Sequence, residues 1–369
     1  MVDMMMPNLL MDILAWNTPV WGYLISVFTD FIGNFGWTII VFTLLLKIIL
    51  IPLDYFQRKN AKRNAELQKI MKPELDKVRQ KYANVSPAIM QQKLQEKQVE
   101  IYKRNNVNVI GSCLVMFFNM AITIVVFLTL FNALNYIANI QITNMYTTLS
   151  NEYIRVYDAT EGDEAEKKAK AEEAVVALYD GGDVVQSWLW VKNVWRGDKS
   201  VSAIPSYKEF ISQSKYSSDE SQTDVYLSEQ DYLKVMQPVM DKEDGWNGYY
   251  ILIALAGIIT YLSMVVSSGG FRKKKDLGDD PTAKITGVLK FILPAIMILF
   301  TLFSNAVFSL YVIANSLFAL CTTPIYNKIF KRKEEQNGGS FGGGFGGSKG
   351  NANELEVDYR IQKNTIIKD

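Results

Sequence analysis

The sequence predicts an all-α membrane protein with five transmembrane helices, its N-terminus outside and its C-terminus in the cytoplasm. Two observations carry this prediction: five apolar segments approach the ~20 residues that a helix needs to cross a bilayer, and the connections between them differ in charge. Averages over the whole chain show neither the apolar segments nor the charge differences. The chain has 39 Lys+Arg and 38 Asp+Glu, and its mean hydropathy is +0.04. One such segment also fits a buried core helix of a soluble protein, but five in 369 residues do not.

The predicted spans contain no Asp or Glu. Only Ser304 and Asn305 separate the last two, which predicts a tight helical hairpin. The five spans cover residues 36–53, 107–134, 249–267, 285–303 and 306–325.

The charges of the connections give the orientation. Residues 54–106 carry 13 Lys+Arg and 6 Asp+Glu, and the loop 268–284 and the start of the tail 326–369 are also basic. Residues 141–246 instead hold 20 acidic and 11 basic residues. Because basic loops stay in the cytoplasm, this pattern places residues 141–246 outside. No Lys or Arg precedes Lys47, so no cleavable signal peptide is expected.

Residues 1–35 are predicted to form an outer segment that includes an amphipathic helix lying in the membrane interface. A simple extension of the first span is the alternative, because Gly33 and Gly36 are only a weak break. The apolar residues at helical spacing are Trp21, Leu24, Ile25, Phe28, Phe31, Ile32 and Phe35.

Residues 54–106 are predicted to form a basic cytoplasmic hairpin of two helices. Ser86 can cap the second helix and Pro87 can occupy its first turn. The apolar stripe of each helix is thin, so the hairpin suits contact with lipid headgroups, ribosomal RNA or emerging chains. A solvated helical connector is the alternative.

The outer region 141–246 is polar enough to form its own small domain. Residues 164–179 are predicted to be helical, with opposite charges four residues apart. Trp188, Trp190 and Trp195 indicate an aromatic belt at the outer membrane surface, with a ligand-binding aromatic face as the alternative. In the cytoplasmic tail, the Gly-rich residues 338–350 are expected to be disordered.

Lys47 is the one charge deep in a predicted span, about 10 Å from its cytoplasmic end. A lysine at the centre of a membrane helix costs about 2.5–3.5 kcal/mol, so it indicates a functional site, unless its ammonium snorkels to the headgroups. Neutral polar residues of other spans could line a wet, cytoplasm-open groove with it, although each alone is more often a helix–helix hydrogen bond. The candidate substrate-groove residues are Lys47, Thr43, Asn119, Thr123, Thr260, Ser263, Asn315 and Ser316.

Composition excludes several classes of function. The chain has no His and only two Cys, so catalytic triads, metal sites and disulfide frameworks are not expected. No phosphate-binding loop is present, and no carboxylate in a span could relay protons. A net charge of +1 gives no reason to expect DNA binding. The composition therefore predicts a membrane protein that is not an enzyme and needs no cofactor.

In the order and spacing of its parts, the chain resembles the YidC/Oxa/Alb family of membrane protein insertases in its bacterial five-span form. The resemblance covers roughly two-thirds of the chain and rests on order and topology together rather than on one motif. The matching segments are Gly36-Trp37 with Ile51-Pro52-Leu53, residues 66–74 (ELQKIMKPE), residues 188–193 (WLWVKN) and residues 310–318 (LYVIANSLF).

The resemblance implies a multi-pass insertase and chaperone of the bacterial cytoplasmic membrane, which inserts nascent membrane proteins through a hydrophilic groove open to the cytoplasm and to lipid. It also implies the ribosome, through the hairpin and basic tail, and a Sec-type translocon as partners. The buried cation of this family is usually Arg, whereas Lys47 keeps the charge without the planar five-donor fork. Residues 141–186 look inserted. A passive channel or carrier, and a scaffold that only assembles other membrane proteins, are the alternative functions.

Overall fold

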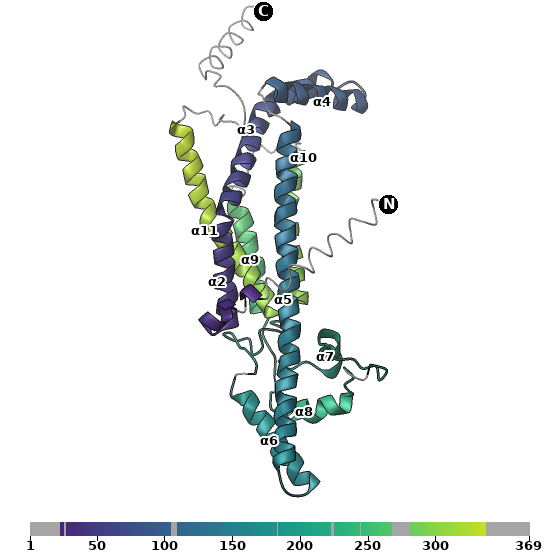
Figure 1. Ribbon diagram of the computed structural model, residues 1–369. Helices are drawn as coiled ribbons and strands as arrows, with labels where there is room; N and C mark the ends of the chain where they lie inside the picture. The colour runs from purple at the N-terminus through teal and green to yellow at the C-terminus, as the bar shows by residue number, and fades with distance from the viewer. Residues whose placement is uncertain are drawn as a thin grey trace, which may run out of the picture. The chain divides into compact units, whose positions relative to one another are not determined.

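The structure is a computed structural model in which regular structure is helical throughout the described part, apart from two isolated bridges. It describes residues 23–25, 27–104, 109–182, 184–222, 225–243, 245–267 and 281–336. A short helical segment, described for residues 23–25 and 27–32, precedes the numbered helices (Figure 1). These are α2 (Phe35–Ile49), α3 (Ile51–Lys81), α4 (Pro87–Arg104), α5 (Val109–Ala159), α6 (Glu164–Asp180), α7 (Tyr207–Gln213), α8 (Glu229–Lys242), α9 (Ile251–Ser267), α10 (Pro281–Phe303) and α11 (Ala306–Gln336).

Membrane-spanning character is clearest in two of the described helices. Residues 124–159 of α5 and residues 306–333 of α11 are long and apolar enough to cross a bilayer. The segment before α2, taken together with α2, makes a third candidate, while α9 and residues 294–303 of α10 are shorter apolar helices. The prediction of an all-α membrane protein is therefore confirmed at this level.

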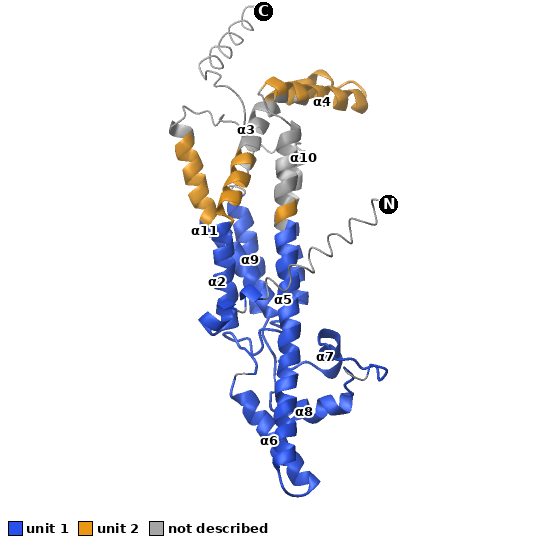
Figure 2. Ribbon diagram, viewed as in Figure 1, with its two compact units in different colours: residues 1–49, 124–321 blue, residues 50–123, 322–369 orange. Residues whose placement is uncertain are grey.

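The chain divides into two compact units (Figure 2). The first, unit 1, comprises residues 1–49 and 124–321, and the second, unit 2, comprises residues 50–123 and 322–369. Each unit has its own buried core, and each is described separately below.

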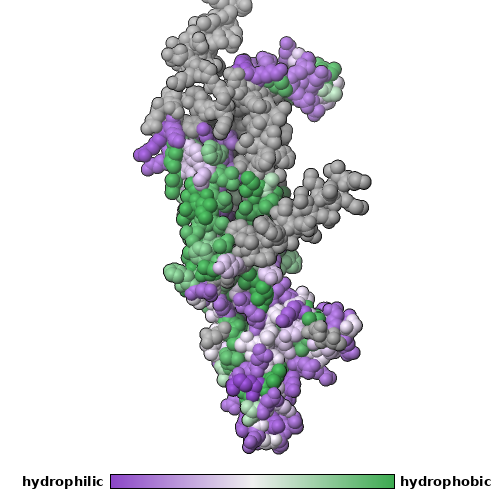
Figure 3. All heavy atoms as spheres, in the orientation of Figure 1, coloured by the Kyte–Doolittle hydropathy of each residue, from purple (hydrophilic) through white to green (hydrophobic). Residues whose placement is uncertain are grey.

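Apolar side chains hold the helices of unit 1 together. Figure 3 shows hydrophobic residues gathered over α2, α9 and α11, and α9 packs along α10. At the centre, four phenylalanines from α5, α10 and α11 meet with ring centroids 5.1–6.5 Å apart. They are Phe127, Phe131, Phe300 and Phe308.

The helix α5 is longer than the sequence predicts. It has 51 residues, or about 77 Å at 1.5 Å per residue, and it continues past the predicted span, which ends at residue 134, to Ala159 in the predicted outer region 141–246. No Gly or Pro occurs between Gly111 and Gly162, so nothing in the chain interrupts the helix. Its far end keeps an apolar face every three or four residues: Ile142, Met145, Tyr146, Leu149 and Tyr153 are all buried.

The polar end of unit 1 is built on that face. Helices α6, α7 and α8 gather around the end of α5 (Figure 1), and the rings of Phe210 and Tyr232 pack against Tyr146 at 5.0 and 5.4 Å. The helix predicted over residues 164–179 is confirmed as α6, whose N-cap Asp163 accepts a hydrogen bond from the Glu166 backbone N–H.

The break before α2 lies at Gly33, whose φ of +81° suits glycine. The helices on either side are bent by 119°, so the segment over residues 23–32 is not a straight extension of α2. After the bend, the Asn34 side-chain oxygen accepts hydrogen bonds from the backbone N–H groups of Gly36 and Trp37, and so caps α2.

The first predicted span, 36–53, is divided. Helix α2 ends at Ile49, and Pro52 lies in the first turn of α3, where its missing N–H costs no helical hydrogen bond. In unit 2, α3 and α4 pack against each other around Leu75 and Ile101, and α4 begins at Pro87.

Candidate functional site

Lys47 lies on the buried face of α2. The residues of α2 that are buried include Phe35, Ile39 and Thr43, and Lys47 follows Thr43 by four residues on the same face. The Lys47 side chain is half-buried. The opposite face carries only exposed apolar side chains: Trp37, Val41, Leu44, Leu45 and Ile48. The only charged residue of α2 therefore lies on the face that packs into the protein.

The other candidate residues divide into four groups. The Thr260 and Ser316 hydroxyls of α9 and α11 lie 2.9 Å apart and form a hydrogen bond, and Ser263, one turn further along α9, is buried. Thr43 is buried too, but its hydroxyl donates to the Ile39 carbonyl of its own helix at 2.6 Å. Asn315 is half-buried beside Ser316. The side chains of Asn119 and Thr123 lie outside the described part of the structure.

A second polar centre, which sequence reasoning missed, lies where α9 begins. Asp198 is only 1% exposed, and its carboxylate accepts three hydrogen bonds. One oxygen accepts from the Trp190 indole N–H at 3.2 Å and the Tyr249 backbone N–H at 2.8 Å, and the other accepts from the Leu252 backbone N–H at 2.6 Å. A carboxylate at this position satisfies free N–H groups of the first turn and favourably meets the positive end of the helix dipole.

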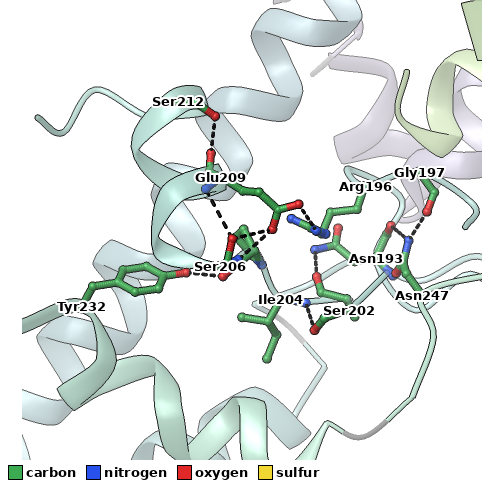
Figure 4. A network of polar contacts seen from close by, with 12 residues as sticks. Asn193, Arg196, Gly197, Ser202, Ile204, Ser206, Glu209, Ser212, Tyr232 and Asn247 are labelled. Carbon is green, nitrogen blue, oxygen red and sulfur yellow. Dashed lines mark hydrogen bonds and ion pairs between the residues drawn. The ribbon is translucent and has the colours of Figure 1, made fainter. Parts of the chain in front are cut away.

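Two buried asparagines continue this centre (Figure 4). The Asn247 amide donates to the carbonyls of Asn193 and Gly197 at 3.0 and 2.8 Å, and its oxygen accepts from the Asn193 N–H at 2.7 Å. The Asn193 side chain in turn donates to the Ala203 carbonyl. Each amide thus replaces backbone partners that this irregular loop lacks.

The same loop also covers the start of α11. The carbonyls of Arg196 and Val194 accept hydrogen bonds from the backbone N–H groups of Ala306 and Val307. The Arg196 guanidinium is buried and pairs with Glu209 at 3.0 Å (Figure 4). We call residues 190–198 with residues 247–250 the terminal clasp, because together they bind the first turns of α9 and α11.

The surroundings of Glu209 lower the pKa of its carboxyl. Burial by itself raises the pKa of this carboxyl, but hydrogen bonds from Ser206 and the charge of Arg196 outweigh burial, and the pKa lies below its ordinary value. Glu209 and Ser206 also form a capping box at the start of α7, which fixes the carboxylate in place.

The tryptophan cluster is not a surface belt. Trp188 and Trp195 are only 9% and 5% exposed and belong to the core of unit 1, where Trp195 packs on Phe35 at 4.2 Å. Trp188 lies directly against Gly36, where even a Cβ atom would come within 2.3 Å of the indole. The interpretation as an aromatic belt is therefore wrong for these two residues, because they pack against Gly36 and Phe35 at the start of α2.

In unit 2, α3 is joined to the last turns of α11 by cations and aromatic rings. The Arg58 guanidinium donates to the buried Thr323 hydroxyl at 2.9 Å and lies 4.8 Å from the centre of the Tyr326 ring. Further along, Lys333 donates to the Tyr55 hydroxyl at 2.7 Å. Hydrogen bonds and cation–ring contacts of this kind stabilise the start of α3 against α11.

Charged side chains also join α3 to the C-terminal part of α4. Glu74 of α3 pairs with Arg104 of α4 and lies 3.6 Å from Lys97. These groups are partly exposed, so they contribute little stability but align the two helices. Within the described residues, no group of His, Cys, Asp and Glu could hold a metal ion.

Comparisons with known proteins agree with the resemblance. A family model described as 60Kd inner membrane protein matches residues 27–334. A Fusobacterium nucleatum protein named Membrane protein insertase YidC is 38% identical over 120 residues, which are 32% of this chain and 51% of that protein. A Leptospira interrogans protein of the same name is 37% identical over 117 residues, 32% of this chain and 16% of that one. A Bacillus anthracis protein named Membrane protein insertase YidC 2 is 38% identical over 100 residues, 27% and 37% of the two chains. The chain thus aligns with about half or less of these relatives.

Proposed function

Because the chain belongs to the 60Kd inner membrane protein family, we propose that it works as a membrane protein insertase and chaperone for nascent integral membrane proteins. The names of its relatives support this function. The observation that carries the proposal is the position of Lys47, the one charge of α2, half-buried on the helix face that packs into the protein.

The topology that we propose has five spans, formed by α2, α5, α9, α10 and α11, with the N-terminus outside and the C-terminus in the cytoplasm. The basic residues 54–106 and the acidic residues 141–246 support this orientation. The bilayer is then the bacterial cytoplasmic membrane. The terminal clasp lies on the outer side, and the α3–α4 hairpin lies in the cytoplasm.

The proposed mechanism begins with the positive charge of Lys47. A short acidic or polar segment of the substrate enters a hydrophilic groove from the cytoplasm, attracted by Lys47 in surroundings of low dielectric constant. Thr260, Ser263 and Ser316 supply hydroxyls on the adjoining helices. The hydrophobic helix of the substrate then moves into lipid, and its burial, with the membrane potential acting on acidic residues, drives insertion.

The partners follow from the charge distribution. The basic hairpin and the basic end of α11 would meet the ribosome and the nascent chain. A Sec-type translocon is a further partner that we propose from the family resemblance alone.

The decisive experiment reconstitutes the chain in liposomes and measures insertion of a single-helix substrate whose translocated tail is acidic. We expect Lys47→Glu to lower the protease-protected fraction several-fold, because the variant repels the acidic tail. Lys47→Arg should retain insertion, since it keeps the charge. The matched control is Lys170→Glu, the same charge reversal at an exposed position of α6.

A second substrate, with the acidic residues of its tail changed to Asn or Gln, makes the test specific for charge. The difference between wild type and Lys47→Glu should shrink with this substrate. Equal insertion by both chains with the acidic tail would remove Lys47 from the mechanism. Solute flux without any nascent chain would favour a channel, and absence of photo-crosslinks to nascent chains from positions 43, 47 and 315 would favour an assembly scaffold.

A further inference from the structure

Leu189 combines two features that are each unfavourable. It is 67% exposed, although it is a large apolar residue, and its φ is +51°, in the left-handed region. It is the first central residue of a two-residue turn, in which the backbone N–H groups of Trp188 and Val191 each donate to the other residue's carbonyl at 2.9 Å. Gly, Asn and Asp dominate positions of positive φ in such turns. A strained, exposed leucine there points to a function for its side chain.

The turn is firmly attached to the start of α2. The Asn34 side chain donates to the Ser187 carbonyl at 3.1 Å, and Trp188 packs on Trp37 with ring centroids 5.5 Å apart. Trp37 itself is 50% exposed, in the first turn of α2. The exposed tip of the turn therefore lies close to the level at which α2 begins.

A second exposed apolar segment lies at the start of α9. Trp246 and Tyr249 are each 55% exposed, with ring centroids 6.2 Å apart. Tyr250 is 42% exposed and also has a positive φ, of +62°. Asp198 fixes this segment by accepting the Tyr249 N–H, and the same carboxylate accepts the indole N–H of Trp190, the other central residue of the turn. The two exposed segments are thus joined through one buried carboxylate.

We propose that these residues form a lipid-contact surface that enters the interfacial layer of the leaflet in which α2 and α9 begin. We define the surface as Trp37, Leu189, Trp246, Tyr249 and Tyr250. Its continuity with the first turns of two membrane helices favours lipid over a protein partner as the occupant. Tyr and Trp prefer this layer, where the ring is in an apolar environment and the polar atom stays hydrated. The buried Trp188 and Trp195 support the surface from inside, while the exposed residues contact lipid.

The test uses spin labels on the full-length chain in liposomes of phosphatidylethanolamine and phosphatidylglycerol, with Cys113 and Cys321 changed to Ser. Labels are placed by Leu189→Cys and Trp246→Cys. Glu173→Cys, on an exposed polar position of α6, is the water reference, and Leu45→Cys, on the exposed apolar face of α2, is the lipid reference. Collision with oxygen reports lipid, and collision with a water-soluble nickel chelate reports water.

We expect positions 189 and 246 to collide with the nickel chelate several-fold less often than position 173, and to approach position 45 in their preference for oxygen. A collision ratio equal to that of position 173 would overturn the proposal. Low collision with both reagents would do the same, because it would show that a second copy of the chain covers the surface. None of these readouts depends on insertase activity.

A second variant separates lipid contact from folding. Leu189→Asn suits the positive φ better, so the unfolding midpoint in detergent should stay equal or rise. The same change should increase the nickel-chelate collisions of a label at position 246, because it removes a neighbouring apolar anchor. A fall in the unfolding midpoint with unchanged collisions would mean that Leu189 is a structural residue only.

Discussion

Replacing Asp198 by Asn tests how much the terminal clasp stabilises the protein. The substitution keeps the size of the side chain and removes its charge. An asparagine has one oxygen in place of two, so if that oxygen keeps the N–H groups of Trp190 and Tyr249, the new NH2 group faces the Leu252 N–H. Two donors would then meet in a site that is only 1% exposed.

The expected loss follows from these contacts. A hydrogen bond to a charged group contributes about 1.5–3 kcal/mol, and a buried N–H left without an acceptor costs about 1–3 kcal/mol. The interaction of the charge with the start of α9 adds about 0.3–1 kcal/mol. These terms overlap, so we expect Asp198→Asn to lower the free energy of unfolding by about 2–4 kcal/mol.

The assay is equilibrium unfolding of the purified chain in mixed micelles, followed by tryptophan fluorescence. Trp190 donates to Asp198, and Trp188 and Trp195 are buried nearby in the same core, so the emission of these indoles reports the clasp directly. The control is Asp158→Asn, which removes the same charge from an exposed position of α5 and should change stability by no more than about 0.5 kcal/mol.

Equal unfolding curves for Asp198→Asn and Asp158→Asn would refute the reasoning. That result would mean that the three N–H groups find other acceptors at no cost, and that the clasp is a covering loop rather than a support for α9. A selective loss in Asp198→Asn, with α-helical content retained before the transition, is the expected outcome.

Two further predictions concern neighbouring contacts. Gly36→Ala places a methyl group 2.3 Å from the Trp188 indole, so it should lower the unfolding free energy by about 1–3 kcal/mol, and Trp188→Leu in the same chain should recover part of that loss in the same assay. The pKa of Glu209 is lowered in the folded chain, so its contribution to stability is complete above the ordinary value of 4.5 and is lost as the pH falls through the folded value. The stability difference between wild type and Glu209→Gln should therefore shrink on acidification from about pH 6 to about pH 3, whereas a constant difference would contradict the role given to its charge.

Local signals predicted part of the fold well. The helix α6 follows from helix-forming residues and paired charges within 17 residues, and Asp163 caps it as such a sequence favours. The length of α5 does not follow from hydropathy, because hydropathy falls after residue 140 while the helix continues to Ala159. Its polar half remains a helix because Tyr146 and Tyr153 are buried against later parts of the chain, which no local pattern reveals.

The candidate site was predictable to the same limited extent. A single charge in an apolar span is visible in the sequence, and helical spacing places Lys47 on the face of Thr43. Asp198 and Leu252 lie 54 residues apart in sequence, so their hydrogen bond could not be predicted from spacing. The only local hints were a polar residue beside a glycine in each half of the clasp, in Gly197-Asp198 and Asn247-Gly248.

The uninterrupted α5 gives unit 1 a mechanical property. From residue 124 to residue 159 the same helix passes through the apolar bundle and carries the polar helices at its far end, with no glycine or proline to act as a hinge. A force on the polar end must then tilt or rotate the whole helix. The part of α5 inside the apolar bundle includes Asn135, whose side-chain oxygen accepts a hydrogen bond from the Asn305 amide at 3.3 Å, just before α11 begins. A ligand that pulls on the polar end would therefore apply torque to the junction between α10 and α11.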